Sequence, residues 1–233
     1  MTKLNKSISV VFPAYNEESN IGVLIDKTIP ILKKYTDIWE IIIVNDGSTD
    51  RTAEVVQVYR NENLSLVNHP YNKGYGAAVK SGITSAKNDL IFFSDSDLQF
   101  DISELSNLLY WIKEYDIVIG YRKNRRDPFV RRLYAFGWNT LVKLAFDLKV
   151  KDINCAFKIF KRHVFDKIRI DATGAMINTD ILAQAVKYGF KIKEVPVTHY
   201  PRLKGKQTGA NIKVIFKAFE ELFRLHRKLK NTT

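Results

Sequence analysis

A single cysteine, Cys155, stands among the 233 residues, so the chain cannot form an internal disulfide. A reducing cytoplasm is therefore the expected environment. The sequence also lacks an apolar run of the roughly 18–20 residues that a membrane-spanning helix needs. Its longest apolar stretches, such as residues 41–44, have the length of buried strands. Only the short run 8–12 follows the first lysines, which indicates a first strand and not a secretory signal.

Glycine and proline are also scarce, with 11 and 6 residues, which leaves no room for a long low-complexity linker. No internal repeat occurs at the spacing of solenoids or propellers. Hydrophobic residues make up 45% and charged residues 27% of the chain, the ordinary balance of a globular protein. We expect one globular domain over residues 1–210, followed by a basic amphipathic helix and tail over residues 211–233.

Positive charge is abundant and unevenly placed: the formal net charge is +12. Residues 122–132 contain six lysines and arginines against one aspartate, and residues 202–230 contain nine against two glutamates. Such patches favour phosphate-bearing partners, namely nucleotides, anionic lipid surfaces or nucleic acid. Charge alone does not choose among these three.

Strand and helix patterns alternate along the chain. Strands are expected at residues 8–12, 40–44, 64–68, 90–94, 116–121, 156–160 and 191–197. Helices are expected up to about residue 34 and at 52–59, 74–85, 179–188 and 212–229, and Asn16 or Ser19 is expected to cap the first of them. Strands separated by helices of this length predict an α/β fold with a mostly parallel sheet covered on both faces.

In open sheets of this kind, ligands bind beyond the carboxyl ends of the strands. Asp95 and Asp97 follow an apolar strand and are two residues apart, so an extended backbone would point both carboxylates the same way. Two carboxylates directed at one point repel each other unless a cation or a proton lies between them. The pattern predicts a site for a hard divalent ion, Mg²⁺ or Mn²⁺, although an isolated pair of this kind can also be a solvated turn.

Two further polar segments leave more than one interpretation open. Residues 45–50 suit a turn and helix cap, and Asp46 at the strand end suits a nucleoside-binding carboxylate equally. Residues 72–78 are weakly similar to a glycine-rich phosphate loop, but they lack the P-loop and dinucleotide fingerprints. The alternative for this segment is a helix start that packs closely on the sheet.

Four segments, taken in order, resemble glycosyltransferase family 2: residues 12–18 (FPAYNEE), 44–50 (VNDGSTD), 72–78 (NKGYGAA) and 95–99 (DSDLQ). Within the family, the chain is most similar to dolichyl- and polyprenyl-phosphate sugar synthases, the mannose and glucose enzymes. The likeness extends over nearly the whole chain and is more specific for the family than for the sugar. It implies a GT-A fold, with a Rossmann-like sheet flanked by helices, and a metal-dependent, inverting hexosyl transfer from a nucleotide sugar such as GDP-mannose or UDP-glucose.

The resemblance also implies roles for individual residues. The nucleoside of the donor would be held by Pro13, Tyr15, Glu17, Val44 and Asp46. The metal ion and the diphosphate would be surrounded by Asp95, Ser96, Asp97 and Gln99. Arginines would bind the phosphates: Arg122 near the sugar phosphate, Arg131 and Arg132 at the acceptor phosphate, and Arg202 with Lys206 on a basic flap over the donor.

The acceptor implied by the resemblance is a polyprenyl or dolichyl phosphate, which is ionised at neutral pH and could attack without a carboxylate base. Arginines would then orient the acceptor and balance its charge. Asp180 lies where other family members place a catalytic acid, and it suits a base, a sugar ligand or a simple first-turn acid. The rival enzyme is a family 2 transferase with a glycan or other hydroxyl acceptor. A basic nucleic-acid-binding protein is disfavoured, because no nucleic-acid-binding motif is present.

Two departures from the family pattern affect these expectations. Asn45 stands where the family usually shows a first aspartate, which leaves Asp46 to act alone. The membrane helices that many relatives carry after the catalytic domain are missing from this sequence. We therefore expect peripheral attachment at the cytoplasmic membrane face, or a membrane-anchoring partner subunit. Phe129, Phe136, Trp138 and the last basic helix suit an anionic surface, although the aromatics suit a core equally.

Overall fold

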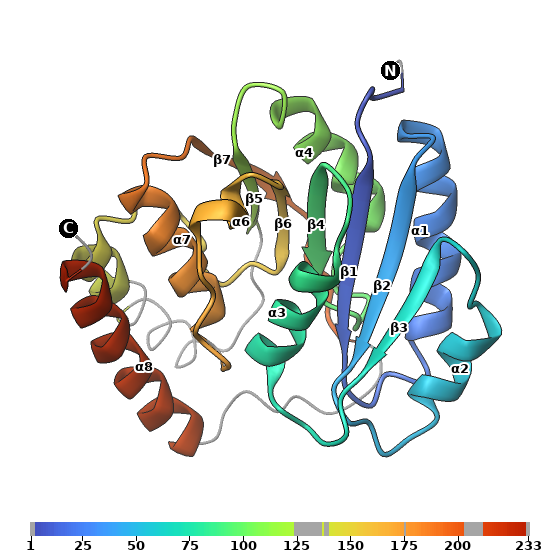
Figure 1. Cartoon of the computed structure of the whole chain (residues 1–233), viewed down its shortest axis with the longest axis horizontal. Coiled ribbons are helices and arrows are strands. Elements are labelled where there is room, and N and C mark those ends of the chain that lie inside the picture. Colours follow the sequence, from blue (N-terminus) through green and yellow to red (C-terminus); the bar gives the residue numbers. More distant parts are fainter. Residues whose placement is uncertain (1–2, 124–136, 138–139, 175, 203–211, 232–233) are drawn as a thin grey trace.

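The structure is a computed structural model that describes residues 3–123, 137, 140–174, 176–202 and 212–231. Within these residues a sheet of seven strands forms the centre of the molecule, in the order β3-β2-β1-β4-β6-β5-β7 (Figure 1). The strands are β1 (Ile8–Ala14), β2 (Trp39–Asn45), β3 (Leu64–Asn68), β4 (Leu90–Ser94), β5 (Ile117–Arg122), β6 (Phe157–Lys161) and β7 (Ile192–Val197).

Strand direction confirms the predicted α/β architecture. The pairs β1–β2, β2–β3, β1–β4 and β5–β7 are parallel, and β6 alone runs antiparallel to both of its neighbours, β4 and β5. The parallel strands β1 and β4 are buried along their whole length, as expected for strands covered on both faces. Because the neighbours β2, β1 and β4 are parallel, their carboxyl ends meet at one edge of the sheet, the lower edge in Figure 1.

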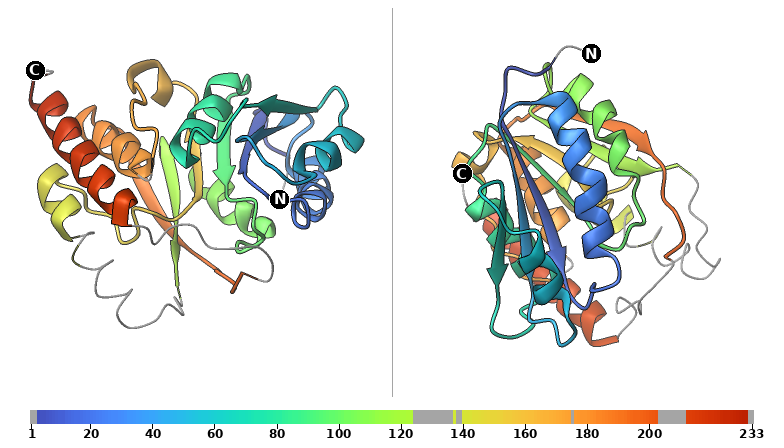
Figure 2. Two further views of the ribbon diagram at one scale, coloured as in Figure 1. Left: turned by 90° about the horizontal axis from the view of Figure 1, so that it is seen from below. Right: turned by 90° about the vertical axis from the view of Figure 1, so that its right-hand side faces the viewer.

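Helices cover both faces of the sheet, and the views in Figure 2 place α1 and α4 on the face opposite α3. The helices are α1 (Ile21–Tyr35), α2 (Thr52–Val58), α3 (Tyr75–Ser85), α4 (Leu105–Trp111), α6 (Val164–Lys167), α7 (Ile177–Lys187) and α8 (Ile212–Asn231), with a short 3-10 turn at Ile102–Glu104. Every predicted strand and helix listed above is present, with ends shifted by a few residues. In the part of the chain that the structure describes, no helix is both long and apolar enough to span a bilayer.

The start of α1 differs from the prediction that Asn16 or Ser19 caps it. Asn20 precedes the helix, and its side chain makes no capping hydrogen bond. Asn16 instead adopts a positive φ of 57°, and its side-chain oxygen accepts a hydrogen bond from the backbone N–H of Thr49 at 2.8 Å. Its own N–H donates to Ser48 Oγ at 3.0 Å. Asn16 therefore fastens the loop after β1 to the loop after β2, which places two predicted site segments side by side.

A glycine at position 47 permits close packing of the loop after β2. Gly47 has a φ of +68°, and a Cβ atom there would lie 2.4 Å from the backbone carbon of Tyr71. A side chain is excluded on both counts, because L-residues disfavour this φ and the space is filled. The turn of residues 45–50 is thus pressed against the segment that leads into α3.

Candidate active site

The carboxyl end of β4 carries the first part of the site. β4 ends at Ser94, and residues 96–98 form a bend, so the extended geometry expected for Asp95 and Asp97 is not found. Two features fix the bend. Ser96 is buried and its hydroxyl donates to the carbonyl of Pro13 at 2.7 Å, and Leu98 has a positive φ of 61°. A non-glycine residue in this region is strained, and such strain concentrates at functional sites.

Both carboxylates of this bend are electrostatically unfavourable in their ionised forms. Burial, and next the negative charge of Asp97, raise the pKa of Asp95 from 3.8 to about 7. Burial also raises the pKa of Asp97, although the N–H of Gln99 and the Arg202 guanidinium counteract it. Two buried carboxylates of raised pKa, one of them raised further by the charge of the other, are the situation that a divalent cation relieves.

The Tyr75 side chain lies next to this pair of carboxylates. The hydroxyl of Tyr75 is buried beside Asp95, and among the described residues it has no hydrogen-bond partner in good geometry. Burial and the Asp95 charge raise its pKa well above the ordinary value, so it stays protonated. The oxygen atoms of Asp95, Asp97 and Gln99 are of the hard type that Mg²⁺ and Mn²⁺ prefer. Within the described residues, no three His, Cys, Asp or Glu side chains converge, so an ion there would take further ligands from a diphosphate or water.

Arg202, in the segment after β7, contacts the carboxylates of Glu17 and Asp97. Its Nη2 donates to Glu17 Oε1 at 2.5 Å, and its Nη1 lies 3.4 Å from Asp97 Oδ2. Glu17 is buried and its other oxygen accepts from Asn20 Nδ2 at 2.6 Å. Burial raises the pKa of Glu17, while Asn20 and Arg202 lower it. The predicted nucleoside, metal and flap residues are therefore neighbours in the structure.

Arg122, at the end of β5, is held by an aspartate that the sequence analysis did not single out. Its Nε donates to Asp152 Oδ2 at 2.7 Å and its Nη2 to Asp152 Oδ1 at 2.9 Å, a bidentate pair with little exposure. Asp152 has no distinguishing spacing in the sequence. Its role follows only from the antiparallel return of β6, which brings the preceding loop beside β5.

Lys158 of β6 is a second residue that the sequence gave no reason to select. It is fully buried opposite Phe93 of β4. Its ammonium donates to the carbonyls of Ile153 and Cys155 and, at 2.8 Å, to Asn178 Oδ1. Burial lowers its pKa to about 8 and raises that of the Cys155 thiol to about 12, so the cysteine is an inert core residue.

Both oxygens of the Asp46 carboxylate make contacts within the protein. Oδ1 accepts from Lys73 N–H at 2.9 Å and lies 2.6 Å from His69 Nδ1, and Oδ2 accepts from Gly74 N–H at 2.9 Å. His69 Nε2 continues to Ser81 Oγ at 2.9 Å. Asp46 thereby holds the start of α3, and nucleoside binding by this residue stays a prediction. Spacing alone did not reveal His69, which had no ligand-like pattern.

Residues 72–78 form a packed helix start. A Cβ on Gly76 would lie 2.6 Å from the carbonyl oxygen of Gly174, and Ala77 N–H donates to the Thr173 carbonyl at 3.1 Å. The helix therefore packs on the loop before α7, and its closeness to that loop accounts for the glycine. This is close packing of the kind proposed as the alternative to a phosphate loop, with the 173–174 loop as a partner of the helix start in addition to the sheet strands β1 and β2 that α3 contacts.

Asp180, in the first turn of α7, is similarly engaged. It is 2% exposed, and Oδ2 accepts from the N–H groups of Asp171 and Ala172 at 2.9 and 3.0 Å. Its Oδ1 accepts from Gln184 Nε2 at 2.7 Å. Of the three interpretations from the sequence, these contacts favour a structural acid that holds the preceding loop.

The remaining predicted residues differ in how accessible they are. Val44 is fully buried, Pro13 presents its carbonyl to Ser96, and Tyr15 is 39% exposed at the rim. Gln99 Nε2 donates to the carbonyl of Tyr200 at 3.0 Å. Arg131, Arg132 and Lys206 lie outside the described residues, as do Phe129, Phe136 and Trp138.

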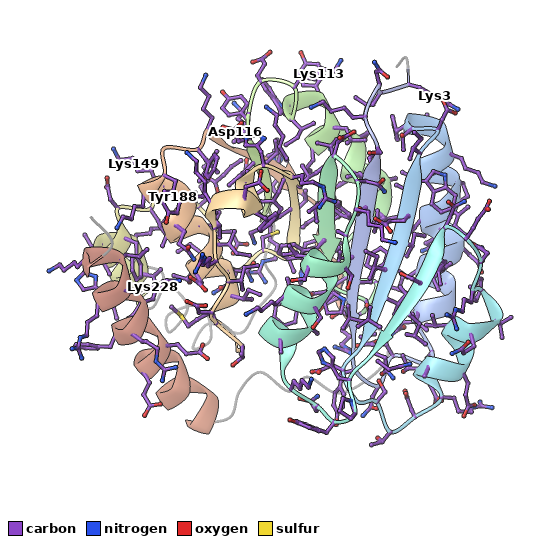
Figure 3. All side chains as sticks on the ribbon, in the orientation of Figure 1. Lys3, Lys113, Asp116, Lys149, Tyr188 and Lys228 are labelled. Carbon is purple, nitrogen blue, oxygen red and sulfur yellow. The ribbon has the colours of Figure 1, made fainter. Side chains whose placement is uncertain are left out.

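Ion pairs elsewhere do not belong to this site. Asp116 pairs with Lys161 and His163 at 3.4 Å, and Figure 3 places Asp116 at the sheet edge opposite the carboxyl ends of β1, β2 and β4. Lys228 of α8, labelled at the left of Figure 3, pairs with Asp171.

Comparison with known proteins places this arrangement in a family. Residues 9–169, more than two thirds of the chain, match the family described as Glycosyl transferase family 2. The chain belongs to glycosyl transferase family 2. The family resemblance seen in the sequence motifs is thereby confirmed.

Curated relatives come from eukaryotes and bacteria. The chain is 35% identical over 209 residues to dolichyl-phosphate beta-glucosyltransferase ALG5A of Trichomonas vaginalis, covering 82% of the chain and 64% of the relative. It is 31% identical to undecaprenyl-phosphate 4-deoxy-4-formamido-L-arabinose transferase of Pectobacterium atrosepticum, covering 90% and 64%. It is 30% identical to dodecaprenyl-phosphate galacturonate synthase of Rhizobium johnstonii, covering 85% and 60%. The chain thus spans less than two thirds of the length of each.

Solved structures confirm the fold. Glucosyl-3-phosphoglycerate synthase from Mycobacterium tuberculosis, in complex with UDP, superposes with a TM-score of 0.77 at 19% identity, covering 96% of this chain and 81% of that one. The same enzyme with Mn²⁺, UDP and phosphoglyceric acid gives a TM-score of 0.73 at 19% identity, covering 98% and 80%. At this identity the likeness concerns the fold alone.

Proposed function

We propose that the chain transfers a hexosyl group from a nucleotide sugar to a polyprenyl or dolichyl phosphate, with inversion at the anomeric carbon. The observation that carries the proposal is a group of charged side chains at the strand ends. Asp95 and Asp97 are two carboxylates of raised pKa. The guanidinium of Arg202 faces Asp97, and Arg122 at the end of β5 contributes positive charge near Asp95. The names of the curated relatives, which all join a sugar to a polyprenyl or dolichyl phosphate, support the acceptor class.

The residues present fit a divalent ion, which Asp95, Asp97 and Gln99 would hold together with the diphosphate of the donor. When bound, Mg²⁺ or Mn²⁺ supplies Lewis acidity that neutralises charge on the departing nucleoside diphosphate. The buried hydroxyl of Tyr75 lies beside Asp95 and stays protonated, so it adds a neutral polar group to this end of the site. Ser96 fastens the bend after β4 to the carbonyl of Pro13 near the end of β1.

Guanidinium groups would orient the phosphates. Arg202 reaches the carboxylates from the segment after β7, and Arg122 is fixed in one orientation by its bidentate pair with Asp152. A fixed planar donor lowers the ordering cost of binding a phosphate. The phosphate oxygen of the acceptor would form the new bond to the anomeric carbon while the bond to the nucleoside diphosphate breaks.

The contacts of Asp180 support a lipid phosphate over a hydroxyl acceptor. A hydroxyl acceptor needs a base that takes its proton, and both oxygens of Asp180 already accept hydrogen bonds from the protein. A phosphate monoester is ionised at neutral pH and loses no proton on attack. On this proposal Arg131 and Arg132 contribute more to turnover than Asp180 does.

We also propose that the chain works peripherally at the cytoplasmic face of a membrane, either directly or through an anchoring subunit. α8 carries Arg224 and Arg227 beside Phe223, whose side chain is 74% exposed. Leu144 is 80% exposed in the segment whose Phe146 packs on His226 of α8. Basic residues next to exposed apolar ones suit an anionic lipid surface.

Vesicle co-sedimentation tests the attachment. Deleting α8 would remove the buried Leu222 and Leu225 and uncover the side chains against which they pack, so a point substitution is sharper. Phe223→Asp should reduce binding to anionic vesicles several-fold, whereas Val58→Asp, at an equally exposed apolar residue of α2, should not. Equal binding by both variants would remove α8 as a membrane contact.

Donor binding tests the enzymatic proposal. The protein is titrated with UDP-glucose, GDP-mannose and UDP-N-acetylglucosamine, each with Mn²⁺ or with EDTA. The UDP bound in the solved neighbours and the glucosyltransferase relative favour UDP-glucose as the first donor to try. Metal-dependent binding that is lost in Asp97→Ala is expected. If the folded protein binds none of these donors, the proposal is wrong.

A further inference from the structure

Arg202 occupies the position of a cation in the carboxylate cluster. One amino group of its guanidinium lies 2.5 Å from Glu17 Oε1, and the other lies 3.4 Å from Asp97 Oδ2. The Arg202 side chain is only 16% exposed, and those of Glu17 and Asp97 are 8% and 10% exposed. Ion pairs shielded from solvent to this degree are less screened than surface pairs.

The contacts of Arg202 with Glu17 and with Asp97 are unequal. Glu17 is held from the other side by Asn20 and receives the short contact, so it is the firmer partner. Asp97 offers Oδ2 at the longer distance, while its Oδ1 accepts from Gln99 N–H at 3.1 Å. The oxygen that faces Arg202 is therefore the one that a metal ion at Asp97 could take without breaking the bend.

The segment that carries Arg202 is fastened to the bend that carries Asp97. Phe100 and His199 form a β-bridge, and their rings pack edge to face at 5.0 Å. Tyr200 N–H donates to the carbonyl of Gln99 at 2.8 Å, and Gln99 Nε2 donates back to the carbonyl of Tyr200 at 3.0 Å. The guanidinium is thus kept within reach of Asp97 whether or not the two are paired.

We propose that Arg202 is the resident counterion of the metal site: it neutralises Asp97 in the metal-free protein, and a divalent ion displaces it from Asp97 while Glu17 retains it. Glu17 is then a positioning residue for Arg202. Displaced by a few ångströms at most, the guanidinium stays at the edge of the site, where the diphosphate of a donor would meet it. This last step rests on the proposed function, whereas the competition with the metal does not.

Opposite effects on two ligands follow from this competition. Arg202→Gln removes the cation that faces the ionised Asp97, so Mn²⁺ alone should bind more tightly. With a nucleoside diphosphate present, the same variant lacks a phosphate contact, so the nucleotide should bind more weakly. A residue that only stabilised the fold, or only bound the donor, would not give a gain in the first measurement.

The test measures Mn²⁺ binding to the full chain by the loss of the free-ion electron paramagnetic resonance signal, without nucleotide. Arg202→Gln is expected to bind Mn²⁺ about tenfold more tightly than the wild type. Arg202→Lys keeps the charge and should stay within about threefold of the wild type. Arg51→Gln, which removes an equal charge from the exposed pair with Glu18, is the matched control and should change nothing.

Equal or weaker Mn²⁺ binding by Arg202→Gln would overturn the proposal, and so would a gain of equal size in Arg202→Lys. Thermal unfolding of each variant checks that the comparison is made on folded protein. Titration with UDP in the presence of Mn²⁺ is then expected to show about tenfold weaker binding for Arg202→Gln. If no variant binds a nucleotide, the proposed function fails, and the Mn²⁺ comparison still decides the competition.

Discussion

The end of β2 and the end of β4 carry aspartates in similar sequence settings, but the structure uses them differently. Both follow buried strands, and both are succeeded by a turn. At the end of β2, Asp46 is saturated: two backbone N–H groups and His69 occupy its oxygens. At the end of β4, burial and mutual repulsion make ionisation of Asp95 and Asp97 unfavourable.

The difference lies in where the donors are. A carboxylate whose oxygens all accept hydrogen bonds from the protein has a structural role, and its removal lowers the stability of the fold. A carboxylate such as Asp95, which is buried and faces a like charge, is poised for a cation. The first kind of aspartate should therefore report on folding and the second on ligand binding, and substitutions can separate the two.

The largest effect is expected at Asp97. Asp97→Asn should lower kcat for hexosyl transfer by about a thousandfold or more, because it removes a metal ligand and its charge. Its thermal unfolding should be unchanged or slightly improved, since repulsion with Asp95 is relieved. Steady-state kinetics and calorimetry on the same preparation check both. Near-normal turnover would remove Asp97 from the metal site.

Asp46 should show the reverse pattern. Asp46→Asn places an amide N–H against a backbone donor in a buried place, which should lower the free energy of unfolding by about 2–4 kcal/mol. Ser81→Ala, which removes only the outer contact of His69, should cost about 1 kcal/mol. Denaturant unfolding measures both values. A stable Asp46→Asn variant that has lost donor binding would instead support the nucleoside-binding role.

Asp180→Asn should keep substantial activity and lose a little stability. Gln184 cannot adapt by turning its amide, because its oxygen accepts from Arg169 N–H and its nitrogen donates to the Arg169 carbonyl. One buried contact is therefore lost, at about 1–3 kcal/mol. Near-complete loss of turnover in a folded variant would favour the hydroxyl-acceptor alternative.

The smallest expected effect is a pH dependence at Asp95. The pKa of Asp95 is about 7 in the folded protein and 3.8 ordinarily, so the folded protein binds this proton more tightly than the unfolded chain does. The stability that protonated Asp95 contributes is therefore present at low pH and is lost as the pH rises toward 7. A metal ion binds the ionised form, so Mn²⁺ should bind about tenfold more weakly at pH 6 than at pH 8. Titrations at the two pH values measure this ratio. Asp95→Asn should flatten it, and a wild-type ratio near one would contradict the assigned pKa.

The sequence by itself determined the strands and most of the helices, because the central strands β1, β2 and β4 are largely apolar runs followed by turn residues. It also pointed to Asp95 and Asp97, the carboxylates proposed to hold the metal, since strand ends of a parallel sheet converge at one edge. The family motifs added Glu17 and Arg202 as members of one site.

Only the tertiary structure decided what each charge does. The structural roles of Asp46 and Asp180 depend on backbone N–H groups that lie 8 to 28 residues away in the chain. The pairing of Arg122 with Asp152 and the burial of Lys158 depend on the antiparallel return of β6. No local pattern encodes such partners, because a side chain's desolvation and hydrogen bonds are set by neighbours that are distant in sequence.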